Sequence, residues 1–378
     1  MTTDAREKTL VVIQLTGGND FMNTLVPYTN EHYYDARKKI VIGQNDVLPI
    51  NKTLGINNNA APLKRLFDEG KVAIVQGIGY PNSNRSHFRG MDIWHTCEPD
   101  RVGSEGWLGL AIKDLDTKSE NVLTGINIGQ GLPRAMSVAG VPVTSVGDLE
   151  SYGVMNKIEQ ERLKERSLQA FKDIYGQAIG SGQVAEYIGK TGLDVLKGAD
   201  LLADVASKYQ SSIEYADNSI AKSLRDVARI HFADLGTRVF YTNHGGYDTH
   251  ANEMPAHPKL LTDLSGAISD FMDDLEEHNA ADDVSILVFT EFGRRMRDNG
   301  SGTDHGSGGG AFLIGKNVKG GLYSEYPSLN PNDWEHGEDL KHTIDFRGIY
   351  GTVLDQWLGL DARPIVKGEF EQIKPFYI

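Results

Sequence analysis

Short apolar runs without polar alternation recur along the chain, and they predict strands that are buried on both faces. Each run is bounded by glycine, asparagine or aspartate, which are typical of turns. The predicted strands are Thr9–Leu15, Lys71–Gly77, Val122–Ile128, Ala135–Ala139, Arg238–Thr242, Val284–Thr290 and Ala311–Ile314. We expect the last two runs to be parallel strands.

Segments with the apolar spacing of amphipathic helices lie between these runs. They are Ala61–Glu69, Phe88–His95, Leu260–His278 and Thr343–Leu358. Alternation of strand and helix favours an α/β fold built on an open, mostly parallel sheet.

Residues 151–232 differ from the rest, because three helical patterns follow one another there without a strand. These patterns cover Glu159–Tyr175, Leu193–Tyr209 and Ile213–Phe232. We interpret residues 151–232 as a helical insertion, or cap, within a single domain of residues 1–378. We expect this cap to overhang the functional edge of the sheet and to shape substrate choice. A separate helical domain is the alternative.

Charge and composition exclude some classes of function. The chain has 378 residues and a formal net charge of −14, which argues against a nucleic-acid partner, because such proteins need a basic face. Cys97 is the only cysteine, so no internal disulfide is expected. No apolar stretch approaches the roughly 18 residues of a membrane span. Both a cytoplasmic protein and an exported (periplasmic) one without its leader remain open, as does the oligomeric state.

Polar clusters follow four of the predicted strands. Ligands bind beyond the carboxyl ends of strands in open α/β sheets, so these clusters are expected to converge there. Each cluster alone is explained equally well by a turn or a helix cap, but their repetition favours a mixed nitrogen and oxygen metal site for Zn²⁺, Mn²⁺ or Ca²⁺. The candidate metal ligands are Asp20, Asp248, His250, Glu291, Asp304 and His305.

Ser86 is the candidate nucleophile, because it lies where a loop enters a helix and the free backbone N–H groups there favour an anion. The alternative is that Ser86 only caps the helix, and Ser83 is a second choice. Arg294 is expected to assist catalysis by holding the oxygens of the substrate. Asn19, Arg85 and His87 are expected to contact the substrate, a small anionic ester, for which a glycan is one candidate carrier.

Several motifs in order resemble a known bacterial family, domain of unknown function 1501. They are Gly17-Gly18-Asn19-Asp20 with Asn23 and Pro27, Ser86-His87-Phe88, Gly246-Tyr247-Asp248-Thr249-His250, Glu291-Phe292-Gly293-Arg294 and Gly302-Thr303-Asp304-His305-Gly306. This family is grouped with the alkaline phosphatase-like superfamily, which includes sulfatases and cofactor-independent phosphoglycerate mutases. The resemblance implies a three-layer αβα sandwich and a metal-dependent hydrolase of phosphate or sulfate esters.

Carried over by position, the resemblance implies metal ligation by Asp20, nucleophilic attack by Ser86, and further ligands at Asp248, His250, Glu291 and the Asp304-His305 pair. Phe292 stands where the superfamily has a metal-binding histidine, and Asp248 and His250 are two residues apart rather than four. These departures argue against a full binuclear site and suggest one metal, a different metal or a site without turnover.

Two other classes of function remain open. A non-catalytic binding protein on the same fold, for a glycan or a partner enzyme, would explain Phe292. A serine esterase is a weaker alternative, since Gly17-Gly18-Asn19-Asp20 resembles the GxND block of SGNH-type hydrolases. A triad of Ser86, His305 and Asp304 is disfavoured, because an adjacent acid and imidazole rarely orient each other well. Elemental analysis would separate the metalloenzyme from the binding protein.

Overall fold

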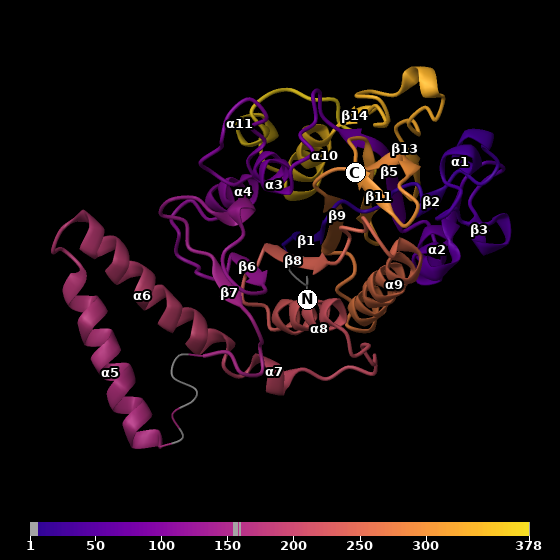
Figure 1. The fold of residues 1–378 in the computed structure, drawn as a ribbon. Coiled ribbons are helices and arrows are strands. Elements are labelled where there is room, and N and C mark those ends of the chain that lie inside the picture. The colour runs from indigo at the N-terminus through magenta and orange to yellow at the C-terminus, as the bar shows by residue number, and fades with distance from the viewer. Residues whose placement is uncertain (1–6, 154–157, 159, 378) are drawn as a thin grey trace.

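A mixed, mostly parallel β-sheet forms the centre of the computed structural model, which describes residues 7–153, 158 and 160–377 (Figure 1). The strands are β1 Thr9–Thr16, β2 Leu25–Val26, β3 Val47–Pro49, β4 Gly55–Asn57, β5 Val72–Gly79, β6 Gly125–Ile128, β7 Thr144–Val146, β8 Val239–Gly245, β9 Val284–Thr290, β10 Arg294–Asp298, β11 Thr303–His305, β12 Gly309–Ile314, β13 Gly321–Tyr323 and β14 Ile344–Asp345. Within the described residues the main sheet has nine strands in the order β13-β5-β12-β9-β1-β8-β6-β7, with β14 beside β5. The predicted α/β class is confirmed.

Helices cover both faces of this sheet. The helices of the described chain are α1 Glu31–Ala36, α2 Ala61–Asp68, α3 His87–Thr96, α4 Trp107–Leu115, α5 Glu161–Ala178, α6 Gln183–Leu202, α7 Val205–Lys208, α8 Ser219–Phe232, α9 Glu253–Glu277, α10 Phe346–Thr352 and α11 Ala362–Val366. Short 3-10 turns lie at η1 Gln44–Asp46, η2 Asn58–Ala60, η3 Arg134–Met136 and η4 Pro331–Asp333, and η5 Val353–Leu358 is π-helical.

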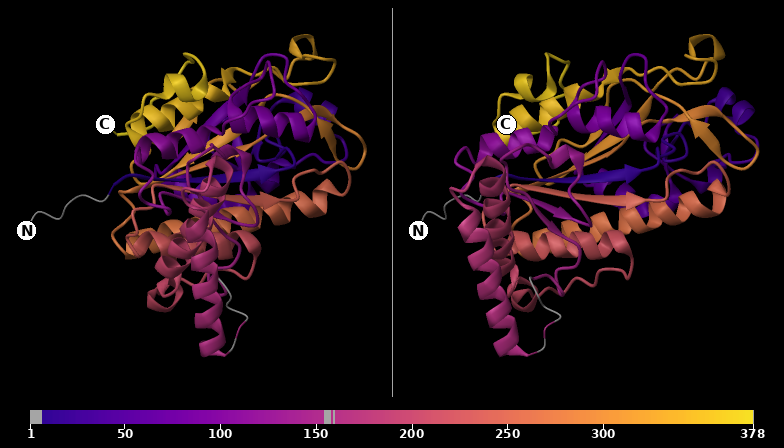
Figure 2. Two further views of the ribbon diagram at one scale, coloured as in Figure 1. Left: turned by 90° about the vertical axis from the view of Figure 1, so that its left-hand side faces the viewer. Right: turned by 60° about the vertical axis from the view of Figure 1, so that its left-hand side comes forward.

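The two faces of the sheet bury separate cores, which makes three layers. Helices α2, α8 and α9 pack on one face, and α3, α4, α10 and α11 pack on the other (Figure 2). Successive residues of β1 alternate between the two cores: Val11 and Ile13 face the first, and Leu10 and Val12 face the second. This explains why the run reads as continuously apolar, since neither face of the strand meets water.

The prediction that Val284–Thr290 and Ala311–Ile314 are parallel strands is wrong. β12 pairs antiparallel with both β9 and β5, whereas β1 pairs parallel with β8 and β9. A parallel return would need a crossover, usually helical, to the far edge of the sheet. The link between β9 and β12 instead contains only the β10–β11 hairpin. Consequently, residues that precede β12 and residues that follow β9 lie at the same edge.

One predicted strand is not observed. Residues of the run Ala135–Ala139 do not form a strand; Arg134–Met136 is a 3-10 turn, and the edge strand of this region is β7, Thr144–Val146. The methionine and alanine side chains of that turn are buried against helices instead, so apolar content alone was misleading there.

The segment proposed as a helical insertion divides into two parts. Helix α8 packs its apolar side into the main core, whereas α5 and α6 form a hairpin that projects from the body (Figures 1 and 2). The base of α6 lies beside the residues that precede β6, where Lys197 Nζ donates to the Glu120 carbonyl at 2.7 Å. The hairpin therefore stands at the end of the sheet where strands begin, and the expectation that it overhangs the carboxyl edge is wrong. None of the described helices has the length and apolar content needed to cross a membrane.

Candidate metal centre

Loops that follow β1, β5, β8 and β9 meet at the carboxyl edge of the sheet, together with the segment before β12. Gly17, directly after β1, shows how closely they pack: its backbone N–H donates to Glu291 Oε1 at 2.9 Å. A Cβ at Gly17, where φ is +121°, would lie 2.3 Å from the backbone nitrogen of Asp248. Only glycine tolerates both the backbone conformation and this approach.

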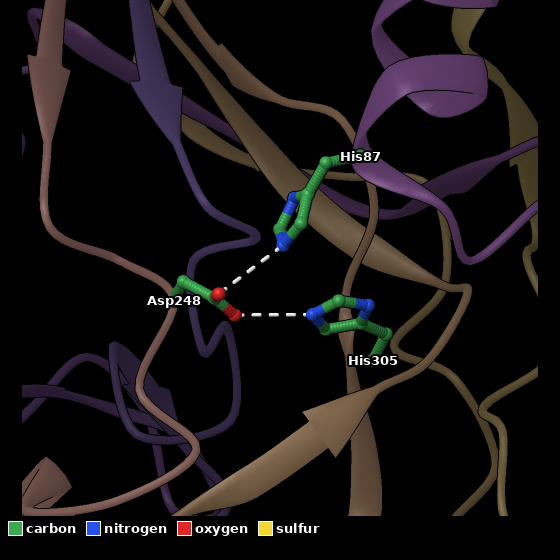
Figure 3. A group of neighbouring side chains, drawn as sticks. All are labelled: His87, Asp248 and His305. Carbon is green, nitrogen blue, oxygen red and sulfur yellow. Dashed lines mark hydrogen bonds and ion pairs between the residues drawn. The ribbon is translucent and has the colours of Figure 1, made fainter.

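His87, Asp248 and His305 form a compact group at this edge, with ligand atoms that all lie within 4.8 Å of one another. Figure 3 shows the Asp248 carboxylate facing both imidazole rings, with one oxygen directed at each. His305 Nε2 lies 3.0 Å from Asp248 Oδ1, and His87 Nε2 lies 3.3 Å from Asp248 Oδ2. The three residues come from α3, the β8–α9 loop and β11.

His250 extends the group on the solvent side. Its Nε2 lies 2.9 Å from His305 Nε2 and 3.2 Å from Asp248 Oδ1. The side chains of His250 and Asp248 are 43% and 47% exposed, so a small solute can reach the group from solvent.

The Nδ1 atoms of two of these imidazoles are held by acceptors. His305 Nδ1 lies 2.7 Å from the Arg85 carbonyl, and His250 Nδ1 lies 3.0 Å from Asp304 Oδ1. A carbonyl and a carboxylate can only accept, so each Nδ1 carries a proton, and each ring in its neutral form then offers the Nε2 lone pair to a cation. Partners of this kind orient metal-binding histidines in proteins.

His87 is held in the same way by Glu291. The Nδ1 of His87 lies 2.8 Å from Glu291 Oε1, and Glu291 Oε2 accepts from Thr290 Oγ1 at 3.1 Å. The Glu291 side chain is fully buried, so it lies behind His87 and orients the ring from there.

This arrangement fits a bound cation. The Nε2 lone pairs of His250 and His305 face each other at 2.9 Å, which is repulsive unless a proton or a cation lies between them. Within the part of the chain that the structure describes, His87 Nε2 lies 3.3 Å from Asp248 Oδ2 without forming a well-aligned hydrogen bond. Ligand atoms of a tetrahedral ion with bonds near 2.0–2.1 Å are roughly 3.3 Å apart, close to the 3.0 and 3.3 Å separations around Asp248.

The pKa values of Asp248, His87 and His305 are shifted from their ordinary values. Burial raises the pKa of Asp248, but hydrogen bonds from Arg294 and His305 outweigh it and lower the pKa to about 2. The hydrogen bond to Glu291 raises the pKa of His87 despite partial burial, whereas burial lowers the pKa of His305. At neutral pH Asp248 is therefore a carboxylate anion. The His87 imidazole binds a proton more readily than an ordinary histidine, and the His305 imidazole binds one less readily.

Arg294, predicted to hold substrate oxygens, is enclosed beneath the group, and its side chain has no exposed surface. Its guanidinium donates to the carbonyls of Gly18 and Thr303 at 2.7 and 2.9 Å and to Asp248 Oδ1 at 2.9 Å. It also donates to the Gly17 and Tyr247 carbonyls. Arg294 thus ties the loops together and orients Asp248.

The structure does not bring Asp20 into this group. Asp20 is buried and forms an ion pair with buried Arg37. Burial raises the pKa of Asp20, but the Arg37 guanidinium outweighs it and lowers the pKa. The Arg37 guanidinium thus occupies the position beside the Asp20 carboxylate that a metal ion would need. Asn19 is also buried; its side-chain carbonyl lies 2.9 Å from His257 Nε2, away from solvent.

Glu253 connects this buried pair to the loops of the candidate centre. Its Oε1 accepts from Asn23 Nδ2 at 3.0 Å, and its Oε2 accepts from Thr249 Oγ1 at 3.2 Å and Thr303 Oγ1 at 2.9 Å. Burial and the negative charge of Asp20 raise the pKa of Glu253 to about 8. Glu253 is therefore protonated in the folded protein at neutral pH.

This pKa leads to a prediction for stability. Glu253 in an unfolded chain titrates near pH ~4.3, so between that pH and about 8 the folded state binds one more proton and its stability falls as pH rises. Gln cannot titrate, so the unfolding free energy of the wild type relative to Glu253→Gln should fall across pH 5–8 by up to about 1.4 kcal/mol per pH unit. Urea denaturation measures this difference, with exposed Glu214→Gln as the control. A difference that is constant over the range would contradict the assignment.

Ser86 lies between two residues that contact the group. It is exposed and takes the N-cap position of α3, and in the described part of the chain its hydroxyl makes no capping hydrogen bond. The backbone N–H of Ser86 donates to Asn84 Oδ1 at 2.9 Å, which sets the loop. The exposed hydroxyl thus remains available beside His87. Arg85 is half-exposed.

His87, expected from sequence to bind substrate, is the residue that supplies the additional imidazole. Phe292 is buried, and its ring centroid lies 5.0 Å from that of His87 and 4.7 Å from that of His305. The sequence signal for this role was Phe292, which stands where the superfamily has a metal-binding histidine. A metal site in this chain would therefore need an imidazole from another element. Sequence spacing alone could not identify α3 as that element. Glu291 and Asp304 were expected as metal ligands. Instead, Glu291 accepts from His87 Nδ1 and Asp304 accepts from His250 Nδ1.

Comparisons with known proteins complete this picture. The sequence model of the family described as "Protein of unknown function (DUF1501)" matches residues 76–368. Comparison with curated protein sequences finds no significant match. Similar solved structures include a protein in the alkaline phosphatase superfamily from Vibrio parahaemolyticus, with 12% identity, a TM-score of 0.43, and coverage of 99% of this chain and 71% of that one.

Two further structures have the same kind of similarity. The sulfatase PsFucS1 from Pseudoalteromonas sp. has 12% identity and a TM-score of 0.44, covering 98% of this chain and 71% of that one. The alkaline phosphatase from the Antarctic bacterium TAB5 has 11% identity and a TM-score of 0.36, covering 84% of this chain and 95% of that one.

Proposed function

The chain belongs to the family described as "Protein of unknown function (DUF1501)", and we propose that it is a metal-dependent hydrolase of phosphate or sulfate esters. One observation carries this proposal: imidazole nitrogens and a carboxylate converge at the N-terminus of α3, where the exposed Ser86 directly precedes His87. An N-capping role for Ser86 would not require the Nε2 atoms of His250 and His305 to lie 2.9 Å apart around one carboxylate.

His87, Asp248 and His305 would hold the ion, with His250 as a fourth donor. This donor set is rich in nitrogen, which suits Zn²⁺ or Mn²⁺ better than Ca²⁺, because Ca²⁺ prefers six or more oxygen ligands. When bound, the ion would lower the pKa of a nearby hydroxyl and offset negative charge on the transferred group.

Ser86 would carry out the chemistry. Its Oγ forms a bond to phosphorus or sulfur as the ester bond breaks, the hydroxyl proton passes to solvent, and the leaving oxygen takes a proton from solvent and departs as the alcohol. Water then cleaves the seryl ester, releases phosphate or sulfate, and restores the hydroxyl. Free N–H groups at the start of α3 favour the anionic group at this place. The substrate is a small anionic ester, and one borne on a glycan would fit the open edge.

Metal content and hydrolysis test this proposal together. Protein purified without chelator is expected to contain stoichiometric Zn²⁺ or Mn²⁺ by elemental analysis, and to release 4-nitrophenol from an aryl phosphate or an aryl sulfate. Chelation should abolish the release and metal addition should restore it, since the ion would activate the hydroxyl and offset the charge on the transferred group. Hydrolysis that survives complete metal removal would contradict the proposal.

A non-catalytic binding protein is the second candidate, and specific observations favour it. Phe292 packs against the rings of both His87 and His305, and Arg37 neutralises Asp20. Both features remove ligands that a binuclear site would use. Stoichiometric metal with no hydrolysis of either ester would support this candidate.

A further inference from the structure

Arg85 and Arg295 flank one buried carboxylate beside the candidate centre. Arg85 Nη1 and Arg295 Nε each lie 3.7 Å from Asp339 Oδ1. The Asp339 side chain has no exposed surface, and among the described residues neither of its oxygens has a hydrogen-bond partner. Asp339 therefore attracts both guanidinium groups without engaging their N–H donors in hydrogen bonds.

Both arginines are connected to the histidine group. The Arg85 carbonyl accepts from His305 Nδ1 at 2.7 Å. Arg295 Nη1 lies 3.7 Å from Asp304 Oδ2, and the other oxygen of that carboxylate orients His250. Side chains of Arg85 and Arg295 are 37% and 31% exposed, so both reach solvent at the edge of the group.

Strand alternation explains why Arg295, rather than Arg294, faces this side. Along β10 the residues alternate, with Arg294 and Met296 buried and Arg295 and Arg297 more exposed. The N–H groups of the Arg294 guanidinium already donate to backbone carbonyls and to Asp248. Arg297 lies further along the strand, 3.6 Å from Glu338 Oε1 and over the Trp334 ring. Among the arginines of β10, Arg295 is therefore the one that faces the histidine group with a guanidinium Nε that makes no hydrogen bond to the described residues.

We propose that Arg85 and Arg295 form a subsite for the non-bridging oxygens of a phosphate or sulfate ester, with Asp339 as a positioning residue that holds both guanidinium groups in place. This rests on the proposed function only for the identity of the ester, because the subsite itself binds the anion. A planar guanidinium presents parallel N–H donors that match such oxygens in pairs. Asp339 keeps the two cations close together while no anion is bound, and its carboxylate competes with the anion for them.

Calorimetric titration of metal-replete protein with inorganic phosphate and, separately, inorganic sulfate tests the subsite without any turnover. Arg295→Ala is expected to weaken binding of the preferred anion by about 10-fold or more, the loss typical of a charge-assisted hydrogen-bonding partner. Arg295→Lys keeps the charge but loses the paired donors, so its affinity should fall between the two. Arg297→Ala, the matched control on the same strand, should bind within about 2-fold of the wild type.

Asp339→Asn supplies a readout that a purely structural role would not give: removing the competing charge should tighten anion binding by about 3-fold or more. Equal losses in the Arg295 and Arg297 variants, unchanged binding in Arg295→Ala, or no binding of either anion by the wild type would overturn the subsite. The proposed function can fail separately. A wild type without metal or hydrolysis that still binds the anion through Arg295 refutes the hydrolase and supports the subsite.

Discussion

Replacing Ser86 by alanine is expected to abolish ester hydrolysis while leaving the metal content of the protein nearly unchanged. Removing the nucleophile from an enzyme that forms a covalent intermediate typically costs at least about 10³-fold in turnover. Ser86 is exposed and does not belong to the group of close-packed ligand atoms, so its loss should not disturb the site. Turnover of an aryl ester and elemental analysis of the same preparation measure both effects.

Ser83→Ala separates the two serines of this loop. If turnover disappears in that variant and survives in Ser86→Ala, the nucleophile has been assigned to the wrong residue. Loss of metal together with turnover in Ser86→Ala would instead make Ser86 part of the metal centre.

His305→Ala is expected to release the metal. The Nε2 of His305 lies within 3.0 Å of both Asp248 Oδ1 and His250 Nε2, so it is central to the donor set. Loss of a partner that only orients a ligand costs about 10–100-fold in affinity, and loss of a ligand should exceed about 100-fold. Competition with a chromogenic chelator measures the affinity of the wild type and the variant for Zn²⁺.

His32→Ala is the control for this variant. His32 lies in α1 and is half-buried, so its removal deletes an imidazole without touching the group. Affinity should stay within about 2-fold of the wild type. Unchanged Zn²⁺ affinity in His305→Ala would mean that the convergent nitrogens do not bind a metal.

Strand ends were the most predictable feature of the site. The runs at Thr9–Leu15, Lys71–Gly77 and Val284–Thr290 became β1, β5 and β9 with nearly the same bounds. An eight-residue strand with no polar alternation must be covered on both faces, and only a layered α/β arrangement does that. The polar residues that follow such strands must then gather at one edge of the sheet, whatever their individual roles.

Roles within the gathered residues were not predictable in the same way. Asp20 and Asp248 each follow a strand, yet Asp20 is buried against Arg37 and Asp248 faces the histidines. Nothing near Asp20 in the sequence distinguishes these outcomes, because Arg37 reaches it from a separate helix-containing segment. The same holds for Asp339, which lies far along the chain from Arg85 but only 3.7 Å away in space.

The amino-acid sequence by itself determined the layered α/β architecture and the edge at which the candidate site lies, because burial of apolar strands is a local property of the pattern. The tertiary structure alone decided which charged groups pair internally and which remain open to a ligand. It placed His87 among the convergent nitrogens, enclosed Arg294, and left Arg85 and Arg295 facing solvent. Pairing of charges depends on distances between segments remote in sequence, and it changes with displacements of a few ångströms that no periodicity records.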